Sequence, residues 1–482
     1  MTQLTVNQWV NSKAMAREYA GDFGDQRLTR RAMQLGAKIA HKPDKPFPKL
    51  FVDDAELEAH YRLMRNPAVS WVDFAAPHAS RTVDRAVGEG EVLVVHDTTD
   101  VTLRTYWTDE RRRHMSKFTS RSQGFLAHGT VAVTAKGMAM PLGLLRLQPF
   151  VHRSQLSKDD AQAWEFWKEA GGLFDNERQR WFEGVAATGA QLAARGVQAV
   201  HVADCETDSY GLLSWLVKQE HRFVVRSAGS RRLDPVDGLR DVGLLQVQLG
   251  QRFDLSADKN RAAHPPRRSR TAQLTVRAGL VRLRRTPNVK EASWSPGGYK
   301  AQPKTLQLHL VEAVEANPPE GEQGVQWQLL TTEPIDTAAD VLRVIELYRR
   351  RWLIEEFFKA LKTGCRLEAR QSESAETMLR VLAMLVPAAW RLLLLRSVAA
   401  EAPDTHWSHL LTPLEFQILR RAVPKAQLAQ DATAEQCLLA IARLGGHLKR
   451  NGRPGWQTLH LGWQQLSDYV EGALLAKDVI NA

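Results

Sequence analysis

Hydrophobic and polar positions divide the chain into three parts with different spacing. Helical spacing dominates residues 1–70 and 371–482. Between them, from 71 to about 370, apolar runs alternate with helical segments. Strands are expected at 91–97, 125–134, 141–149, 198–204 and 221–226, and helices at 159–172, 178–194 and 208–219. A strand meander followed by alternating helices and strands predicts a mixed α/β sheet with helical regions on both sides.

The N-terminal part carries basic residues along its predicted helices. Asp25 is placed to cap a helix running to about Ala40. A second helix, 54–65, is stopped by Pro67, and Ser70 with Asp73 forms a capping box for a third, running to about residue 87. A basic stripe beside an apolar one suits a helix laid along DNA, although a solvated surface helix shows the same pattern. The basic residues on these two helices include Arg27, Arg30, Arg62 and Arg65.

Between Arg226 and Trp327 the pattern changes. Residues 259–304 contain twelve Lys or Arg and one acid. The segment LTVRAGLVRLRR alternates as strands do. We therefore expect a basic, β-rich insertion at about 227–325, either a surface for the DNA backbone or a flexible basic loop.

The C-terminal part is helical, with helices expected at 376–399, 413–423, 433–444 and 456–476. Its longest apolar stretch, 381–395, is interrupted by Pro387 and Arg391. Because this stretch falls short of a membrane span, we expect a buried helix and no membrane partner.

Residues 348–362 read YRRRWLIEEFFKALK, which predicts one amphipathic helix. Its apolar face would be buried. A lone carboxylate among cations suits a site that holds a divalent metal and grips phosphates, and an ordinary solvated face is the alternative. The polar face carries Tyr348, Arg351, Glu355, Lys359 and Lys362.

Two further acids lie at the expected ends of apolar strands. Asp97 ends the run that begins at Glu91, and Asp204 ends the run that begins at Val197. The carboxyl ends of strands are where open α/β sheets place their ligand sites. With Glu355, these residues make a candidate triad for Mg²⁺ or Mn²⁺, which prefer carboxylate oxygens.

Taken together, these segments resemble the bacterial cut-and-paste DDE transposases, most closely those of the transposon-five type. The family signature is Tyr, two residues, Arg, three residues, Glu, six residues and Lys, and residues 348–362 meet it. The acids fall in VHDTTDVTLR and ADCETDSYGLL, and WQLLTTEPIDTAADVLRVIELY and FVVRS also match. The resemblance covers nearly the whole chain. One departure is Cys205, where the family often has Arg after the second acid.

The resemblance implies a ribonuclease-H-like catalytic core at 71–370, with a helical end-binding domain at 1–70 and a helical dimerisation domain at 371–482. It also implies that the end-binding domain contacts DNA through Arg27, Arg30, Arg62 and Arg65. It implies two ions per active site, Mg²⁺ with Mn²⁺ as a substitute, held by Asp97, Asp204 and Glu355. The chemistry would be strand nicking, hairpin formation and resolution, and strand transfer, within a homodimer that holds transposon ends and target DNA. Residues expected on DNA are Tyr348, Arg351, Lys359, Lys362 and Arg226, with Trp327 stacking on a flipped base.

Two other functions share parts of this pattern. A ribonuclease-H-like nuclease without strand transfer would need the same acids. A catalytically inactive DNA-binding repressor would need only the basic surfaces.

Composition agrees with a nucleic-acid enzyme. There are 65 Lys and Arg against 54 Asp and Glu, a formal net charge of +11, so phosphate is attracted and binding should depend on salt. Three scattered cysteines are too few for a zinc site or a disulfide framework. With a start unlike a signal peptide, these features lead us to expect a bacterial cytoplasmic protein associated with the nucleoid.

Overall fold

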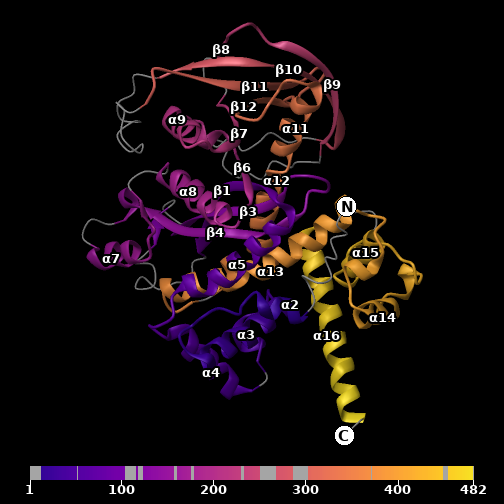
Figure 1. The fold of residues 1–482 in the computed structure, drawn as a ribbon. Helices are drawn as coiled ribbons and strands as arrows, with labels where there is room; N and C mark the ends of the chain where they lie inside the picture. The colour runs from indigo at the N-terminus through magenta and orange to yellow at the C-terminus, as the bar shows by residue number, and fades with distance from the viewer. Residues whose placement is uncertain are drawn as a thin grey trace.

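The computed structural model describes residues 12–51, 53–103, 115–117, 123–156, 160–174, 178–228, 233–249, 268–285, 302–370, 372–448 and 454–480. They fold around a 12-stranded mixed sheet, in the order β5-β4-β3-β1-β6-β7-β12-β11-β10-β8, with β2 on β3 and β9 on β10 (Figure 1). β2 (Ser116–Lys117) and β5 (Leu173–Phe174) are its short strands on β3 and β4. The mixed α/β sheet predicted from the sequence is therefore confirmed.

The centre of the sheet combines both kinds of pairing. β1 (Glu91–Leu103) is antiparallel to β3 (Gln123–Thr134), which is antiparallel to β4 (Pro141–His152). On its other side β1 is parallel to β6 (Gln198–Ala203), which is parallel to β7 (Arg222–Arg226). Parallel neighbours need a crossover, and helices α8 (Gln179–Ala193) and α9 (Tyr210–Lys218) supply helical segments between these strands.

The predicted β-rich insertion extends the same sheet. Its strands are β8 (Asp234–Pro235), β9 (Arg240–Leu249), β10 (Arg270–Arg284) and β11 (Thr305–Glu315), and β11 pairs with β12 (Gln326–Thr331), which follows the insertion. β12 pairs with β7, and this joins the insertion to the central strands. The segment that was predicted to alternate lies in β10, while much of the basic stretch 259–304 falls outside the described residues.

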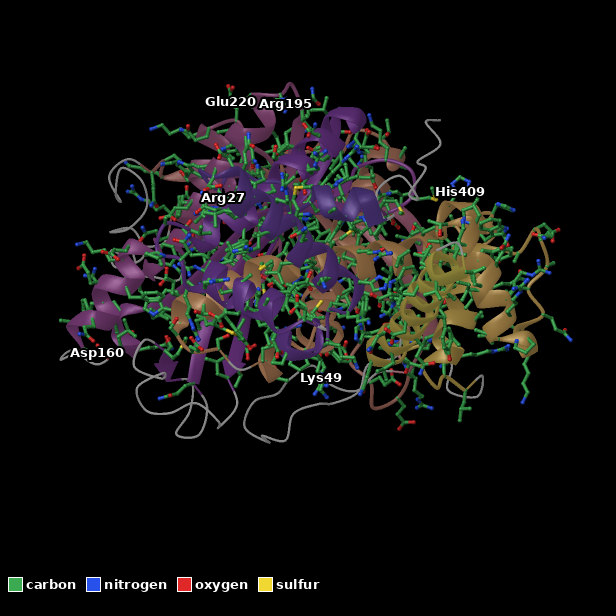
Figure 2. All side chains as sticks on the ribbon, turned by 90° about the horizontal axis from the view of Figure 1, so that it is seen from below. Arg27, Lys49, Asp160, Arg195, Glu220 and His409 are labelled. Atoms are coloured by element: carbon green, nitrogen blue, oxygen red, sulfur yellow. The ribbon has the colours of Figure 1, made fainter. Side chains whose placement is uncertain are left out.

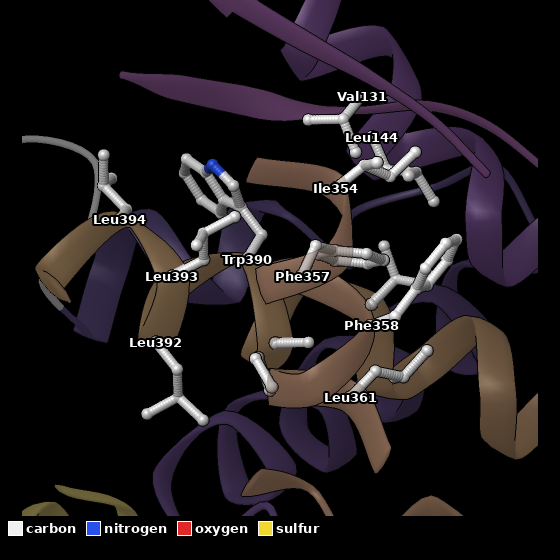
Figure 3. Close-up of a cluster of buried hydrophobic side chains, with 14 of the residues drawn as sticks. Val131, Leu144, Ile354, Phe357, Phe358, Leu361, Trp390, Leu392, Leu393 and Leu394 are labelled. Atoms are coloured by element: carbon white, nitrogen blue, oxygen red, sulfur yellow. The ribbon is translucent and has the colours of Figure 1, made fainter. Parts of the chain in front are cut away.

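Helices cover both faces of the central strands. α8 and α9 pack on one face, where Trp181 and Leu213 share a buried cluster with Phe223. On the other face lie α11 (Ala338–Arg349) and α12 (Trp352–Lys359). Figure 3 shows Ile354 of α12 pointing toward Val131 and Leu144 of the sheet.

The N-terminal helices form as their capping residues predict. They are α2 (Ser12–Arg17), α3 (Gln26–His41), α4 (Asp54–Arg65) and α5 (Trp71–Glu89). The Asp25 carboxylate accepts the N–H of Arg27, and Ser70 with Asp73 completes the capping box. In Figure 1 α3 and α4 lie below α5, away from the sheet.

The C-terminal helices also match the expected positions. They are α13 (Ala375–Glu401), α14 (Pro413–Ala422), α15 (Ala434–Leu444) and α16 (Trp456–Ile480). By length and composition alone, α13 as a whole is long and apolar enough to cross a membrane, and the stretch 381–395 is only part of it. Its apolar window is nevertheless entirely buried inside the protein, as expected of a core helix.

Two local predictions are wrong. The first strand does not end at Asp97 but continues to Leu103, because β3 goes on pairing with it after β6 has stopped. The expected single helix over 348–362 is divided. α11 ends at Arg349. The joint that follows is held by i to i+3 hydrogen bonds, for example from the Ile354 N–H to the Arg351 carbonyl. α12 then passes into a π-helical turn at Ala360–Gly364.

Candidate active site

Strand register brings the two strand acids to the same level. The parallel pairing of β1 and β6 ends at Val95 opposite Val202. Two residues further along each chain are Asp97 and Asp204, whose side chains therefore leave the same face of the sheet. Arg226 ends β7 at the corresponding level, since Ala203 pairs with Val225.

Each acid has a local reason for its position. Asp97 stays fixed in β1 opposite Gly129 of β3, with its carboxylate accepting the Thr98 N–H at 2.8 Å. Asp204 leaves β6 and caps a short 3-10 helix, Cys205–Thr207, by accepting the N–H of Glu206 at 2.9 Å. Only Asp204 thus follows the strand-end pattern that the sequence suggested for both.

Glu355 reaches this place from α12. Glycine at position 129 permits a close approach, because a Cβ there would lie 3.0 Å from the ring of Phe358. The guanidinium of Arg351 then joins two of the acids: it lies 3.3 Å from Asp97 Oδ2 and donates to Glu355 Oε1. We call Asp97, Asp204 and Glu355 the acid cluster.

Charges in the acid cluster act strongly on one another. Burial, together with the carboxylates of Asp204 and Glu355, raises the pKa of Asp97 to about 7, against the opposing effect of Arg351. Burial lowers the pKa of Arg351, but the charges of the surrounding acids and of Tyr348 outweigh it and the net pKa is raised. The cluster is therefore a place that stabilises a cation.

Trp327 and Tyr348 lie on the same side of the sheet as the acid cluster. Their rings meet edge to face at 5.7 Å. Tyr348 is buried in α11, while Trp327 in β12 is only half-buried. Arg226 donates to the sulfur of Cys205 at 3.2 Å, so its guanidinium lies beside the residue that replaces the family arginine.

The two lysines of the signature segment are placed differently. Lys362 lies 3.0 Å from Asp100 and 3.6 Å from Glu368. Lys359 pairs with Glu356 at 2.9 Å and lies over the Trp352 ring, so no observed contact brings it to the acid cluster. Sequence reasoning missed Asp100 and Glu368; the acid three residues after Asp97 was the only available signal for the first.

The candidate contacts in the N-terminal part are exposed. Arg27 and Arg30 lie on α3, and Arg62 and Arg65 lie on α4. Arg27 pairs with its capping residue Asp25, on the side of the molecule seen from below in Figure 2, and Arg65 pairs with Glu373.

The opposite face of the same strands holds buried histidines that sequence reasoning also missed. His96 Nε2 lies 2.9 Å from His201 Nδ1, and His128 Nδ1 lies 2.9 Å from the hydroxyl of Thr98. Burial lowers the pKa of all three imidazoles well below the usual range. We call His96, His128 and His201 the histidine row.

The acid cluster fits a divalent metal by its chemistry. Its donors are carboxylate oxygens, the ligands that Mg²⁺ and Mn²⁺ prefer, and a protein cation already bridges two of them. Within the described ranges no three His, Cys, Asp or Glu side chains gather closely enough to hold an ion. A metal held by Asp97 and Glu355 would take oxygens that Arg351 now engages.

Comparison with known families identifies two segments. A model of the transposase DNA-binding domain matches residues 8–69, and a model of the transposase DDE domain matches residues 183–389. The second range contains Asp204, Glu355 and all of 348–362, whereas Asp97 lies outside both ranges and joins the site through its geometry. DDE transposases use divalent metal ions, and this domain implies a ribonuclease-H-like core.

Proposed function

Because the chain carries a transposase DNA-binding domain followed by a DDE transposase catalytic domain, the domain order of the transposon-five type, we propose that it performs cut-and-paste transposition. The proposed steps are a nick at the transposon end, hairpin formation on the opposite strand, hairpin resolution by water, and attack of the freed 3′-hydroxyls on target DNA. One site can serve every step, since each is an in-line displacement at phosphorus.

The acid cluster would hold two divalent ions, Mg²⁺ or Mn²⁺. When bound, such ions activate the attacking hydroxyl and stabilise the leaving oxygen. Arg351, Lys362 and Arg226 would hold phosphates on either side of the scissile bond, as guanidinium and ammonium groups do. Tyr348 and Lys359 are further candidates for contacts along the same strand.

Trp327 would receive the base that leaves the stack when the strand bends into a hairpin. Its support is the half-buried ring beside Tyr348, on the side of the sheet that carries the acid cluster. A flat aromatic ring offsets part of the unstacking cost, on the order of a few kcal/mol.

We also propose how the parts of the chain divide the work. Residues 1–70 would bind the transposon ends through Arg27, Arg30, Arg62 and Arg65, and 371–482 would hold a homodimer together. The dimer proposal is supported by α16, which projects from the body in Figure 1 and exposes Leu475, Val479 and Ile480 by 62%, 77% and 82%. The protein would act in the bacterial cytoplasm, on the nucleoid.

The observation that carries the proposal is that Asp204 and Glu355, both inside the matched DDE domain, lie with Asp97 of β1 around one guanidinium. The test incubates the full chain and Mg²⁺ with a labelled duplex that carries the inverted repeats flanking its gene. We expect nicks at the repeat boundary, then hairpins, then insertion into a plasmid. Nicking without hairpins or insertion would favour the nuclease, and binding without cleavage would favour the repressor.

A further inference from the structure

Arg351 occupies the centre of the acid cluster. Its two terminal nitrogens are divided between Asp97 Oδ2, at 3.3 Å, and Glu355 Oε1. Its side chain is only 12% exposed. The position between these two carboxylates is therefore filled by a cation of the protein itself.

A guanidinium in this position competes directly with a metal ion. Mg²⁺ requires oxygen ligands at about 2.0–2.1 Å in near-octahedral geometry, and the N–H groups of Arg351 engage oxygens that would have to provide them. In the part of the chain that the structure describes, no group of three potential ligands is ready to hold an ion. The guanidinium of Arg351 thus lies on carboxylate oxygens that a metal would need.

A DNA phosphate offers Arg351 an equivalent partner. Guanidinium binds phosphate in the same bidentate manner as carboxylate. Lys362, another candidate phosphate contact, is likewise paired with two carboxylates, those of Asp100 and Glu368. Both cations can therefore pass from a carboxylate to a phosphate when DNA enters.

The backbone next to Arg351 is anchored to the sheet. The neighbouring Arg350 donates to the carbonyls of Thr134 and Gly137, both at 2.7 Å, and this anchors the joint between α11 and α12 to the turn after β3. With the backbone held, Arg351 would release Asp97 and Glu355 by rotation about its side-chain bonds.

We propose that Arg351 plugs the metal site of the free protein, and that a phosphate of bound DNA withdraws the plug. This inference rests on the proposed function and adds a way of regulating it. The DNA-bound protein would bind metal more tightly than the free protein does, and the metal-bound protein would bind DNA more tightly. By linkage, the factor by which DNA raises metal affinity equals the factor by which metal raises DNA affinity. The free protein would bind metal only weakly. It would therefore not nick DNA that it contacts briefly without placing a phosphate at Arg351.

The first test uses Mn²⁺ alone and the full chain without DNA. Titration calorimetry should show Arg351→Ala binding Mn²⁺ about tenfold more tightly than the wild type, within the roughly 5- to 150-fold range of such couplings. Arg351→Gln, which keeps the length and loses the charge, should follow it. Lys362→Ala is the matched control: it removes a cation that lies on Asp100 and not in the acid cluster, so DNA-free Mn²⁺ affinity should not change. Thermal melting checks that each variant folds.

Equal or weaker Mn²⁺ binding by both Arg351 variants would overturn the plug. If neither folds, the wild type decides: the inverted-repeat duplex, added in the cold where turnover is slow, should tighten Mn²⁺ binding, and unchanged affinity refutes the inference. Nicking of that duplex by the wild type, without a gain in the variants, refutes the plug alone. A gain in the variants without any wild-type nicking supports the plug and refutes transposition.

Discussion

Two neighbouring residues of β1 point to opposite faces of the sheet, and the two faces hold different kinds of polar group. His96 points to the face under α8, where the histidine row is buried, and Asp97 points to the face under α12, where the acid cluster lies. On the first face burial keeps the imidazoles neutral and bonded to one another and to Thr98. On the second, carboxylates remain close together with a single guanidinium between two of them. One face buries neutral imidazoles, and the other retains charge that an outside ligand can use.

The largest expected effect comes from the acids. Asp97→Asn, Asp204→Asn and Glu355→Gln should each slow nicking by about 10³-fold or more, since each removes charge that would hold the catalytic ions. End binding should be nearly unchanged. A gel time course on labelled end DNA measures both, and nicking near the wild-type level in any variant removes that residue from the cluster.

A tryptophan on each face offers the next comparison. Trp181 is 1% exposed and meets His128 edge to face at 4.6 Å, so Trp181→Ala should cost about 3–5 kcal/mol of stability and weaken every step together. Trp327→Ala should leave the first nick intact and impair the hairpin steps. Melting curves run beside the cleavage assay separate the two. If Trp327→Ala lowers the melting temperature and reduces all cleavage products equally, Trp327 is a core residue and does not receive a flipped base.

Two glycines let a helix approach each face. A Cβ at Gly129 would lie 3.0 Å from Phe358 of α12, and a Cβ at Gly184 would lie 3.1 Å from His128. Overpacking by Gly129→Val or Gly184→Val should cost about 1–3 kcal/mol in urea unfolding. Only Gly129→Val should also raise the Mg²⁺ concentration needed for nicking, because it displaces the helix of Glu355. The same metal dependence in both variants would contradict this division.

The smallest expected effect is on the stability of the fold at low pH. Because the pKa of His128 and His201 is lowered in the folded protein from 6.5, the unfolded chain binds more protons below that pH. Their contribution is complete above pH 6.5 and is lost as pH falls, by up to about 1.4 kcal/mol per pH unit for each histidine. His201→Asn should make the decline between pH 7 and 5 shallower by at most that slope. Urea unfolding at several pH values gives the answer, and an unchanged slope would mean that His201 is not buried neutral.

The sequence predicted the elements far better than the side-chain partners. Periodicity and capping residues placed most helices and strands, because these signals are local: Asp25, Ser70 and Asp73 cap as expected. The division of the 348–362 helix was not visible, since the joint depends on Arg350 reaching two carbonyls more than 200 residues away in the chain.

Part of the candidate site was also accessible from sequence alone. The family signature pointed to Arg351 and Glu355, and apolar runs pointed to Asp97 and Asp204. What the sequence could not indicate was that Arg351 would lie between two of these acids. Nor could it reveal the histidine row, because His96, His128 and His201 come from three strands whose neighbours are fixed only by the register of the sheet.

The alternation along β1 also limits how the gene for this chain can change. Because side chains alternate with a period of two, inserting one codon before position 96 would turn the aspartate toward the face under α8 and the histidine toward the face under α12. A substitution in this strand alters one contact, whereas such an insertion exchanges the two environments at once. Insertions and deletions should therefore be tolerated only in the segments between strands. A library of gene variants with single-codon insertions or deletions, selected for function, should contain no survivors with a change inside β1.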